Sequence, residues 1–256
     1  KFYINGEWVD SLGSETIEVI NPSDESVIGS ISAGTKEDIN VAVAAAKEAF
    51  KTFGFSSKEE RIELLENIIS EYEKRSEELA KTISEEMGAP LWLSNVAQVT
   101  SGLSHFKDTL EVLKTFEFEG VENNYLVRKE PIGVIGMITP WNWPINQIAL
   151  KVLPALASGC TMILKPSEIA PLSGMLFTEM IHDARIVPLT KDAPIDDDIR
   201  LWFFQNHRYN VHQQRGSPMK SLIKLIAANC KEQGAQTTHE CLQDCLRAVE
   251  GRYDCF

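Results

Sequence analysis

Two short apolar runs, separated by a helical pattern, lie near the middle of the chain. Residues 133–138 (GVIGMI) and 161–164 (TMIL) lack polar alternation, which is typical of strands buried on both faces of a parallel sheet. Residues 145–158 between them have apolar positions at helical spacing, with a break or kink expected near Pro154 and Gly159 placed to end the helix. This order predicts a βαβ unit with parallel strands and a right-handed crossover.

Polar residues follow each of the two predicted strands. Thr139-Pro140-Trp141-Asn142 comes after the first strand, and Lys165-Pro166-Ser167-Glu168 comes after the second. Ligands of parallel α/β sheets bind beyond the carboxyl ends of the strands, so the two clusters predict a ligand site. Asn142 is also a good helix cap and Pro144 is tolerated in a first helical turn, so we expect the helix to start here with Asn142 as its cap. No G-x-G-x-x-G segment lies between the strands.

The chain before residue 133 predicts strands followed by a layer of helices. Asn5-Gly6 predicts a tight hairpin within residues 2–9, and residues 16–20 alternate like a strand. Capping-box patterns at residues 35–38 and 57–60 each open an amphipathic helix. Further helices are expected at residues 79–87, which Gly88 and Pro90 end, at 96–114 and at 172–184, with an extended strand at 125–130.

Composition limits the classes of function. The 256 residues are 43% hydrophobic and carry a formal net charge of −12, with −13 in residues 1–184 and +1 in residues 185–256. An acidic chain is a poor partner for nucleic acids or anionic membranes, and no apolar run reaches the roughly 20 residues of a membrane span. Lys1-Phe2-Tyr3 is not followed by the apolar stretch of a signal peptide. We therefore expect a soluble, cytoplasmic protein.

The motifs T-P-W-N-W-P at 139–144 and L-K-P-S-E at 164–168 resemble the aldehyde dehydrogenase family, whose members commonly read P-W-N-[FYW]-P and then K-P-[SA]-E. The resemblance runs from Phe2 to about Ala184. It implies that residues 1–184 form part of a doubly wound, Rossmann-like NAD-binding domain in an α/β fold. It also implies that residues 125–131 belong to an arm that pairs with another subunit; the bare sequence equally fits an edge strand of the same domain.

The same resemblance assigns roles to residues of the two clusters. Asn142 matches the side chain that holds the oxyanion during aldehyde oxidation, and Lys165 and Glu168 match the residues that hold the adenosine ribose. A carboxylate at Glu168 would repel a 2′-phosphate, so NAD is favoured over NADP. The wall beside the cofactor is matched by Ile138, Thr139, Pro140 and Trp141.

The later motifs of the family are absent from this chain. It has no F-T-G-S loop for the nicotinamide end, no E-L-G-G segment with the general base and no G-Q-x-C segment with the nucleophilic cysteine. Cys160 comes just before a predicted buried strand and is expected to be an inert core thiol. We therefore expect no aldehyde oxidation by this chain alone, with weak residual NAD binding, and a homo-oligomer or a full-length family subunit as partner.

Residues 185–256 have a different character and no family match. They hold four of the five cysteines, and short helices are expected near 196–204, 220–229 and 240–250. A change of reading frame, an alternative terminus or a fused segment would each explain the change. A metal or disulfide module is an alternative to free thiols, although the spacings lack C-x-x-C and we expect no metal site. Its candidates are Cys230, His239, Cys241, Cys245 and Cys255.

Overall fold

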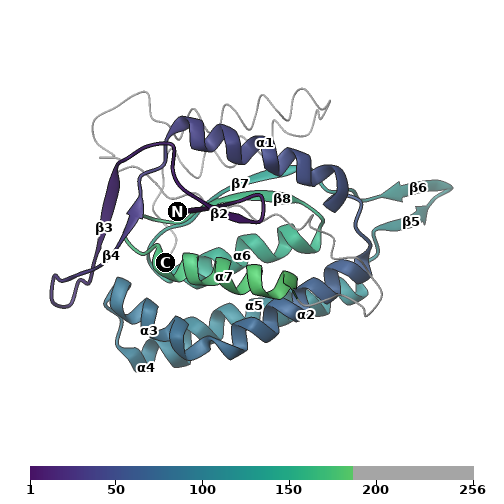
Figure 1. The fold of residues 1–256 in the computed structure, drawn as a ribbon. Coiled ribbons are helices and arrows are strands. Elements are labelled where there is room, and N and C mark those ends of the chain that lie inside the picture. Colours follow the sequence, from purple (N-terminus) through teal and green to yellow (C-terminus); the bar gives the residue numbers. More distant parts are fainter. Residues whose placement is uncertain (187–256) are drawn as a thin grey trace. The chain divides into compact units, whose positions relative to one another are not determined.

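A two-stranded parallel ladder lies inside the folded part of the chain. The computed structural model describes residues 1–186. Strand β7 (Val134–Ile138) pairs in parallel with β8 (Thr161–Lys165), with Val134 opposite Thr161 and Ile138 opposite Lys165. Helix α6 (Pro144–Ala157) connects them and continues past Pro154 without a break (Figure 1). The predicted parallel βαβ unit is confirmed.

The two strands differ in burial. Every residue of β8 is buried, whereas only Met137 of β7 is buried and its other residues are partly exposed. The prediction that both strands are buried on both faces is therefore wrong for β7. Each strand has the other as its only strand neighbour within residues 1–186, so the difference comes from the helices, which pack mainly against β8 and cover β7 less.

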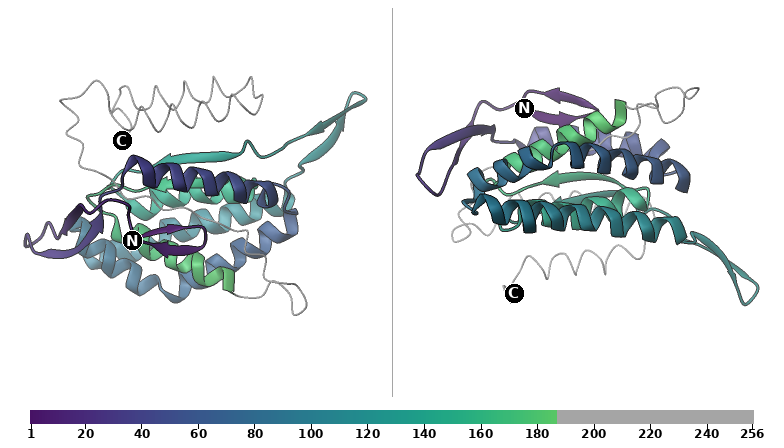
Figure 2. Two further views of the ribbon diagram at one scale, coloured as in Figure 1. Left: turned by 45° about the horizontal axis from the view of Figure 1, so that its top comes forward. Right: turned by 90° about the horizontal axis from the view of Figure 1, so that it is seen from below.

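Helices cover both faces of the ladder. Helix α1 (Lys36–Phe53) packs on one face, and α6 and α7 (Leu172–Ile186) lie on the other (Figures 1 and 2). Helices α2 (Lys58–Lys74), α3 (Ser76–Met87) and α5 (Thr100–Thr115) form a further layer against α6 and α7. The fully buried aromatic side chains Tyr72, Phe106 and Phe177 meet between these helices, which joins the layers in one core.

Both predicted capping boxes are present. The Thr35 side chain caps α1 and is bonded reciprocally by Asp38, and Ser57 with Glu60 does the same for α2. Each box satisfies two backbone donors that a helix start leaves without partners. Helix α3 ends at Gly88 in the left-handed conformation, as the sequence predicts.

The helix predicted at residues 96–114 starts earlier and is irregular. It comprises α4 (Leu91–Leu93), a π-helical segment η1 (Ser94–Val99) and α5. A π-turn inserts an extra residue into the hydrogen-bond ladder and leaves no signature in a 3.6-residue apolar pattern. In α5, Gly102 allows close approach of α2, because a Cβ atom there would lie 2.4 Å from the Tyr72 hydroxyl.

Three antiparallel hairpins complete the described part. Strand β1 (Phe2–Ile4) pairs with β2 (Glu7–Val9) through the predicted Asn5-Gly6 turn, in which both residues have positive φ. Strand β3 (Thr16–Ile20) is confirmed, and its partner β4 (Val27–Ser32) was not predicted. Strand β6 (Tyr125–Arg128) pairs with β5 (Glu119–Glu122), also not predicted, in a hairpin that projects from the helices (Figures 1 and 2).

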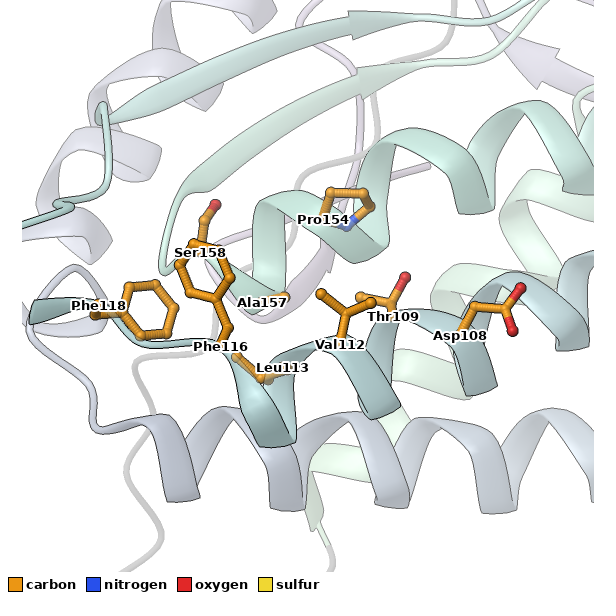
Figure 3. Close-up of a pocket in the computed structure, with 9 residues that line it drawn as sticks. All are labelled: Asp108, Thr109, Val112, Leu113, Phe116, Phe118, Pro154, Ala157 and Ser158. Atoms are coloured by element: carbon orange, nitrogen blue, oxygen red, sulfur yellow. The ribbon is translucent and has the colours of Figure 1, made fainter.

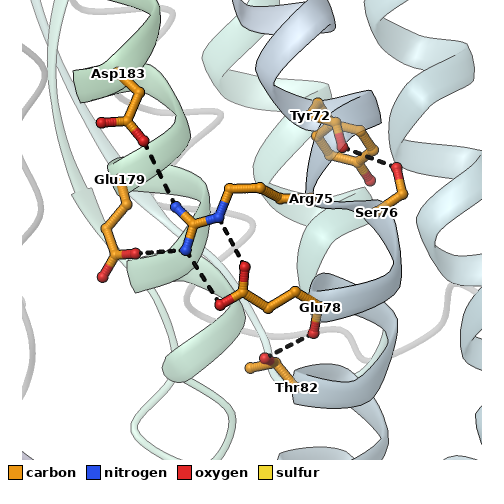
Figure 4. Close-up of polar contacts among 7 residues, drawn as sticks. All are labelled: Tyr72, Arg75, Ser76, Glu78, Thr82, Glu179 and Asp183. Carbon is orange, nitrogen blue, oxygen red and sulfur yellow. Dashed lines mark hydrogen bonds and ion pairs between the residues drawn. The ribbon is translucent and has the colours of Figure 1, made fainter.

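A cluster of charged side chains ties α7 to the junction of α2 and α3. The Arg75 guanidinium lies 2.8 Å from both Glu78 and Glu179 and 3.8 Å from Asp183 (Figure 4). The hydrogen bonds from Arg75 lower the pKa of Glu78. These contacts hold the outer face of α7 in place.

Several sequence predictions concern residues beyond 186 and lie outside the described residues. They are the short helices after residue 195 and the cysteine and histidine set from Cys230 to Cys255. Within residues 1–186, no helix is long and apolar enough to cross a membrane. The same range contains no group of three or more acidic, histidine or cysteine side chains arranged to hold a metal ion.

Candidate functional site

The two polar clusters predicted from the sequence meet at one edge of the parallel ladder. Ile138 and Lys165 are direct partners across β7 and β8, so Thr139 and Pro166 leave the sheet side by side. The Thr139 backbone N–H donates to the Lys165 carbonyl at 3.2 Å, which extends the pairing by one step. The structure therefore brings Ile138–Trp141 and Lys165–Glu168 together at the carboxyl ends of the strands, where α/β sheets bind ligands.

The turn after β7 is exposed and ends in an unusual backbone conformation. Trp141 and Asn142 are exposed, and Trp143 is left-handed with φ 59° and ψ 56°. A left-handed non-glycine residue costs on the order of 1–3 kcal/mol and is found where the surroundings fix it, often at functional sites. The exposed face of this turn borders the edge that carries Lys165.

The prediction that Asn142 caps α6 is wrong. The helix begins at Pro144, and the cap position falls on Trp143, which makes no side-chain capping bond. Proline disfavours the right-handed helical conformation in the residue before it, and here Trp143, which directly precedes Pro144, is left-handed and is the last residue outside the helix. Asn142 is one residue further out, and its amide is not used to hold the helix.

The turn after β8 places a cation beside an anion. The Lys165 ammonium lies 3.3 Å from Oε2 of Glu168, and the two side chains are 11% and 25% exposed. Burial lowers the pKa of Lys165, and the charge and hydrogen bond of Glu168 oppose that shift. The separation exceeds the roughly 2.7–2.9 Å of a strong charge-assisted bond, so both groups retain capacity for a ligand.

Two hydroxyl groups at this edge have roles that sequence reasoning did not assign. The Ser167 hydroxyl accepts from the Ile169 backbone N–H at 3.3 Å and so shapes the turn. The Thr139 hydroxyl is buried and has no hydrogen-bond partner within the described residues. A serine hydroxyl that accepts from the backbone N–H two residues later is a known turn pattern, so the role of Ser167 could have been predicted from the sequence. The missing partner of the Thr139 hydroxyl depends on the packing around it and could not have been predicted.

A cavity lies at the opposite end of the ladder, and none of the predicted site residues lines it. A cavity of about 360 Å³ lies between α5, the end of α6 and the segment that follows α5, with Phe116 and Phe118 at one end and Asp108 at the other (Figure 3). Ser158 on its wall precedes β8, so the cavity is at the amino end of that strand. Cys160 is at the same end, a free and buried thiol. Neither faces Lys165 and Glu168.

The site at the carboxyl ends suits binding better than bond cleavage. A carboxylate can accept from two neighbouring hydroxyl groups, an ammonium can donate to either, and the unsatisfied Thr139 hydroxyl can do both. Among residues 1–186, the only cysteine lies at the far end of β8. The described part of the chain therefore presents a polar cradle at Lys165 and Glu168 and no thiol nucleophile beside it.

Comparison with known proteins identifies relatives of this part of the chain. A model of the aldehyde dehydrogenase family matches residues 8–189. A 3-succinoylsemialdehyde-pyridine dehydrogenase from a Pseudomonas species is 48% identical over 189 residues, which cover 73% of this chain and 40% of that protein. The chain thus spans about 40% of the length of this curated relative.

Solved structures give the same answer. The aldehyde dehydrogenase of Bartonella henselae superposes with a TM-score of 0.74 at 44% identity, covering 81% of this chain and 42% of that chain. The C291A variant of aldehyde dehydrogenase C from Pseudomonas syringae, in complex with NAD⁺ and octanal, gives 0.74 at 39% identity and covers 81% and 41%. Betaine aldehyde dehydrogenase of Staphylococcus aureus with NAD⁺ gives 0.72 at 30% identity and covers 81% and 40%. The βαβ unit with helices on both faces is their Rossmann-like fold.

Proposed function

The chain belongs to the aldehyde dehydrogenase family, and from that premise we propose that residues 1–184 carry the adenosine end of an NAD site. In this proposal Glu168 accepts hydrogen bonds from the ribose hydroxyls and Lys165 donates to them. Ile138, Thr139, Pro140 and Trp141 form the wall beside the nucleotide. The observation that carries the proposal is the pairing of Ile138 with Lys165, which sets the two clusters beside each other at the carboxyl ends of β7 and β8.

The side chains at this edge suit a ribose. Glu168 is partly exposed and can accept from two neighbouring hydroxyl groups, while the ammonium of Lys165 remains within reach. The unsatisfied Thr139 hydroxyl gives a buried polar atom that a ligand would satisfy, which removes a cost of about 1–3 kcal/mol. When bound, NAD supplies the hydride acceptor of aldehyde oxidation.

The charge at Glu168 favours NAD over NADP. A 2′-phosphate would bring two negative oxygens against a carboxylate that is already three-quarters buried, so repulsion would be poorly screened. NADP should therefore bind more weakly than NAD, and Glu168→Gln should narrow that difference.

We assign to Asn142 the oxyanion role that the family motif implies, on an exposed turn that leaves its amide free to donate. Aldehydes are the substrate class of the assembled family site, to which residues 1–186 contribute this amide and the adenosine end. We also propose a cytoplasmic location for this chain.

Calorimetry with NAD, ADP-ribose and AMP tests the proposal. If only the adenosine end is held, all three ligands should bind with equal affinity. We expect dissociation constants of about the millimolar range, because each 1.4 kcal/mol of binding free energy lost with the missing contacts weakens affinity about tenfold. Glu168→Ala should abolish binding, while Glu85→Ala on an exposed face should not. Tight binding that requires the nicotinamide would show that residues 187–256 complete the site and would overturn the division of the chain near Ala184.

A second candidate function is association through the β5–β6 hairpin. Val121, Tyr125 and Leu126 are 77%, 74% and 66% exposed, an unusual amount of apolar surface for a free hairpin. Both outer edges of this hairpin are unpaired within residues 1–186, so it can add to a sheet of another copy or of a full-length family subunit. Sedimentation should show self-association, or co-sedimentation with such a subunit, that Leu126→Asp abolishes and Glu85→Ala preserves. Monomers at all concentrations, with no binding to the subunit, would rule this function out.

A further inference from the structure

A buried glutamate on α3 reaches across to the first turn of α7. The Glu86 carboxylate accepts from the backbone N–H groups of Leu172 and Ser173, the latter at 3.0 Å through Oε1 and the former through Oε2. Glu86 is 1% exposed, and it comes from the last turn of a helix 86 residues earlier in the chain. Both oxygens of one side chain are therefore used to hold the start of another helix.

Helix α7 has no local means of capping itself. The residue before it is Pro171, whose side chain offers no acceptor, and the first helical bond runs from the Met175 N–H to the Pro171 carbonyl. The N–H groups of the first turn have no acceptor within a helix, and Ser173 is fully buried away from water. Without Glu86 these donors would be left unsatisfied in the interior.

The start of α7 is also the end of the turn that carries Glu168. Residues 166–171 connect β8 to α7, and Glu168 lies in the middle of them. One end of this turn is fixed where the Lys165 carbonyl accepts from Thr139, and the other end is fixed where Glu86 holds Leu172 and Ser173. Moving the second anchor would move the Glu168 carboxylate relative to Lys165.

We propose that Glu86 is a positioning residue for the nucleotide site, acting through the start of α7 on the turn that carries Glu168. The inference rests on the proposed NAD site for its ligand. Helix α3 contributes no residue to the carboxyl ends of β7 and β8, but through Glu86 it sets the position of Glu168 relative to Lys165. Such indirect supports commonly decide how well a binding group is pre-organised.

The ionised carboxylate is the form that fits two donors. A protonated acid carries a hydrogen on one of its oxygens, so that oxygen becomes a donor and a poorer acceptor. In glutamine the amide nitrogen takes the place of that oxygen and can only donate. Burial raises the pKa of Glu86 to about 7, and hydrogen bonds from Ser173 and Leu172 oppose that rise. Its two protonation states are therefore both accessible near neutral pH.

The charged groups around Glu86 are occupied elsewhere. On α7, Glu179 and Asp183 bind Arg75, and on α3 the neighbouring Glu85 pairs with Lys81. In the connecting turn Glu168 faces Lys165, on α2 Glu71 pairs with Lys74 and Glu73 with Lys107, and α4 and η1 contain no charged residue. Within residues 1–186 Glu86 has no ion-pair partner, so its protonation is set by burial and by the hydrogen-bond donors of Ser173 and Leu172.

The test is the affinity of the full chain for ADP-ribose, whose phosphates do not titrate between about pH 5.5 and 8.5, in Glu86→Gln and in the matched control Glu85→Gln. At pH 8 we expect Glu86→Gln to bind about tenfold more weakly than the control, the effect of one lost charged hydrogen bond. Near pH 5.5 the two should converge, because the control then carries a protonated Glu86. If the affinities of the two variants differ by the same factor at every pH in this range, the proposal is overturned. Titration of histidines does not confuse the comparison, because both variants contain the same histidines.

A second measurement separates this inference from the nucleotide site itself. Amide exchange at Leu172 and Ser173 should be about tenfold faster in Glu86→Gln than in Glu85→Gln at pH 8, while exchange in the middle of α2 stays unchanged. If the parent chain binds no ADP-ribose, the proposed function fails, and faster exchange would still support Glu86 as the anchor of the turn. Unchanged exchange at both amides would refute the anchor whatever the binding data show.

Discussion

Two buried carboxylates in this chain have pKa values that are shifted in opposite directions. Asp38 is 2% exposed and Glu86 is 1% exposed, so both are removed from water. Burial acts to raise the pKa of Asp38, but hydrogen bonds from Leu12, Thr35 and Ser11 outweigh it and the net shift is downward. Glu86 has only the donors of the first turn of α7, and its pKa rises to about 7. The number of donors that reach a buried carboxylate therefore decides which protonation state the fold favours.

Replacing Asp38 with asparagine should destabilise the N-terminal part. Oδ2 of Asp38 accepts from the Ser11 hydroxyl, the Thr35 N–H and the Thr35 hydroxyl at 2.8–2.9 Å, and Oδ1 accepts from the Leu12 N–H at 2.9 Å. An amide keeps one acceptor and, in either orientation, turns a donor toward the donors on its other side. We expect a loss of about 2–3 kcal/mol in the free energy of unfolding, measured by urea denaturation. Glu37→Gln, one residue away and exposed, is the control and should change stability by less than about 0.5 kcal/mol.

The same substitution has a defined pH signature. Because the folded pKa of Asp38 is lowered from 3.8, its contribution is present above that value and is lost as the pH falls through the folded pKa. The stability difference between the parent and Asp38→Asn should therefore be constant near neutral pH and shrink below about pH 4. A difference that grows on acidification would contradict the assignment of an ionised Asp38.

At the level of elements, the sequence predicted those whose ends carry local chemistry. Thr35 and Ser57 mark the starts of their helices because their side chains form capping hydrogen bonds within one turn. Asn5-Gly6 predicts a hairpin because both residue types tolerate the positive φ that its turn requires. Strands β4 and β5 were missed because their residues are mostly exposed or partly exposed and give no apolar alternation. The positions of Lys165 and Glu168 followed from strand ends and family motifs, whereas the Glu86 contact joins residues far apart in sequence and has no local pattern.

The approach of α2 to α5 depends on one missing side chain. A Cβ atom at Gly102 would lie 2.4 Å from the Tyr72 hydroxyl, which itself donates to the Val99 carbonyl at 2.9 Å. Gly102→Ala should cost about 1–3 kcal/mol through overpacking, seen as a lower urea midpoint. Tyr72→Phe removes the clashing oxygen, so the double variant should be more stable than the sum of the two single changes predicts. If the stability losses of Gly102→Ala and Tyr72→Phe simply add in the double variant, the Tyr72 oxygen is not the source of the clash, and α2 and α5 instead move apart to accommodate the new side chain.

For the whole molecule, family membership and catalytic competence are separate matters. Residues 8–189 match the family, while the relative from Pseudomonas is covered over only 40% of its length. The described part supplies a parallel ladder, its helical cover and the cradle at Lys165 and Glu168. The 256 residues contain no segment like those that carry the family's nucleophilic cysteine or its general base. The proposed adenosine site and the chemical step are therefore separable by experiment in this chain.

The purified chain, free of any full-length family enzyme, should form no NADH above background from propanal or benzaldehyde. The reason is the missing thiolate and base, since loss of a nucleophile typically removes several orders of magnitude in rate. Absorbance at the NADH band over hours, with a full-length family enzyme as positive control, gives the measurement. Cys160 cannot substitute, because it is buried at the amino end of β8, away from the cradle. Turnover that persists in Cys160→Ser but disappears when Cys230, Cys241, Cys245 or Cys255 is replaced would show that residues 187–256 contribute a nucleophile of their own, and the chain would then be an aldehyde-oxidising enzyme.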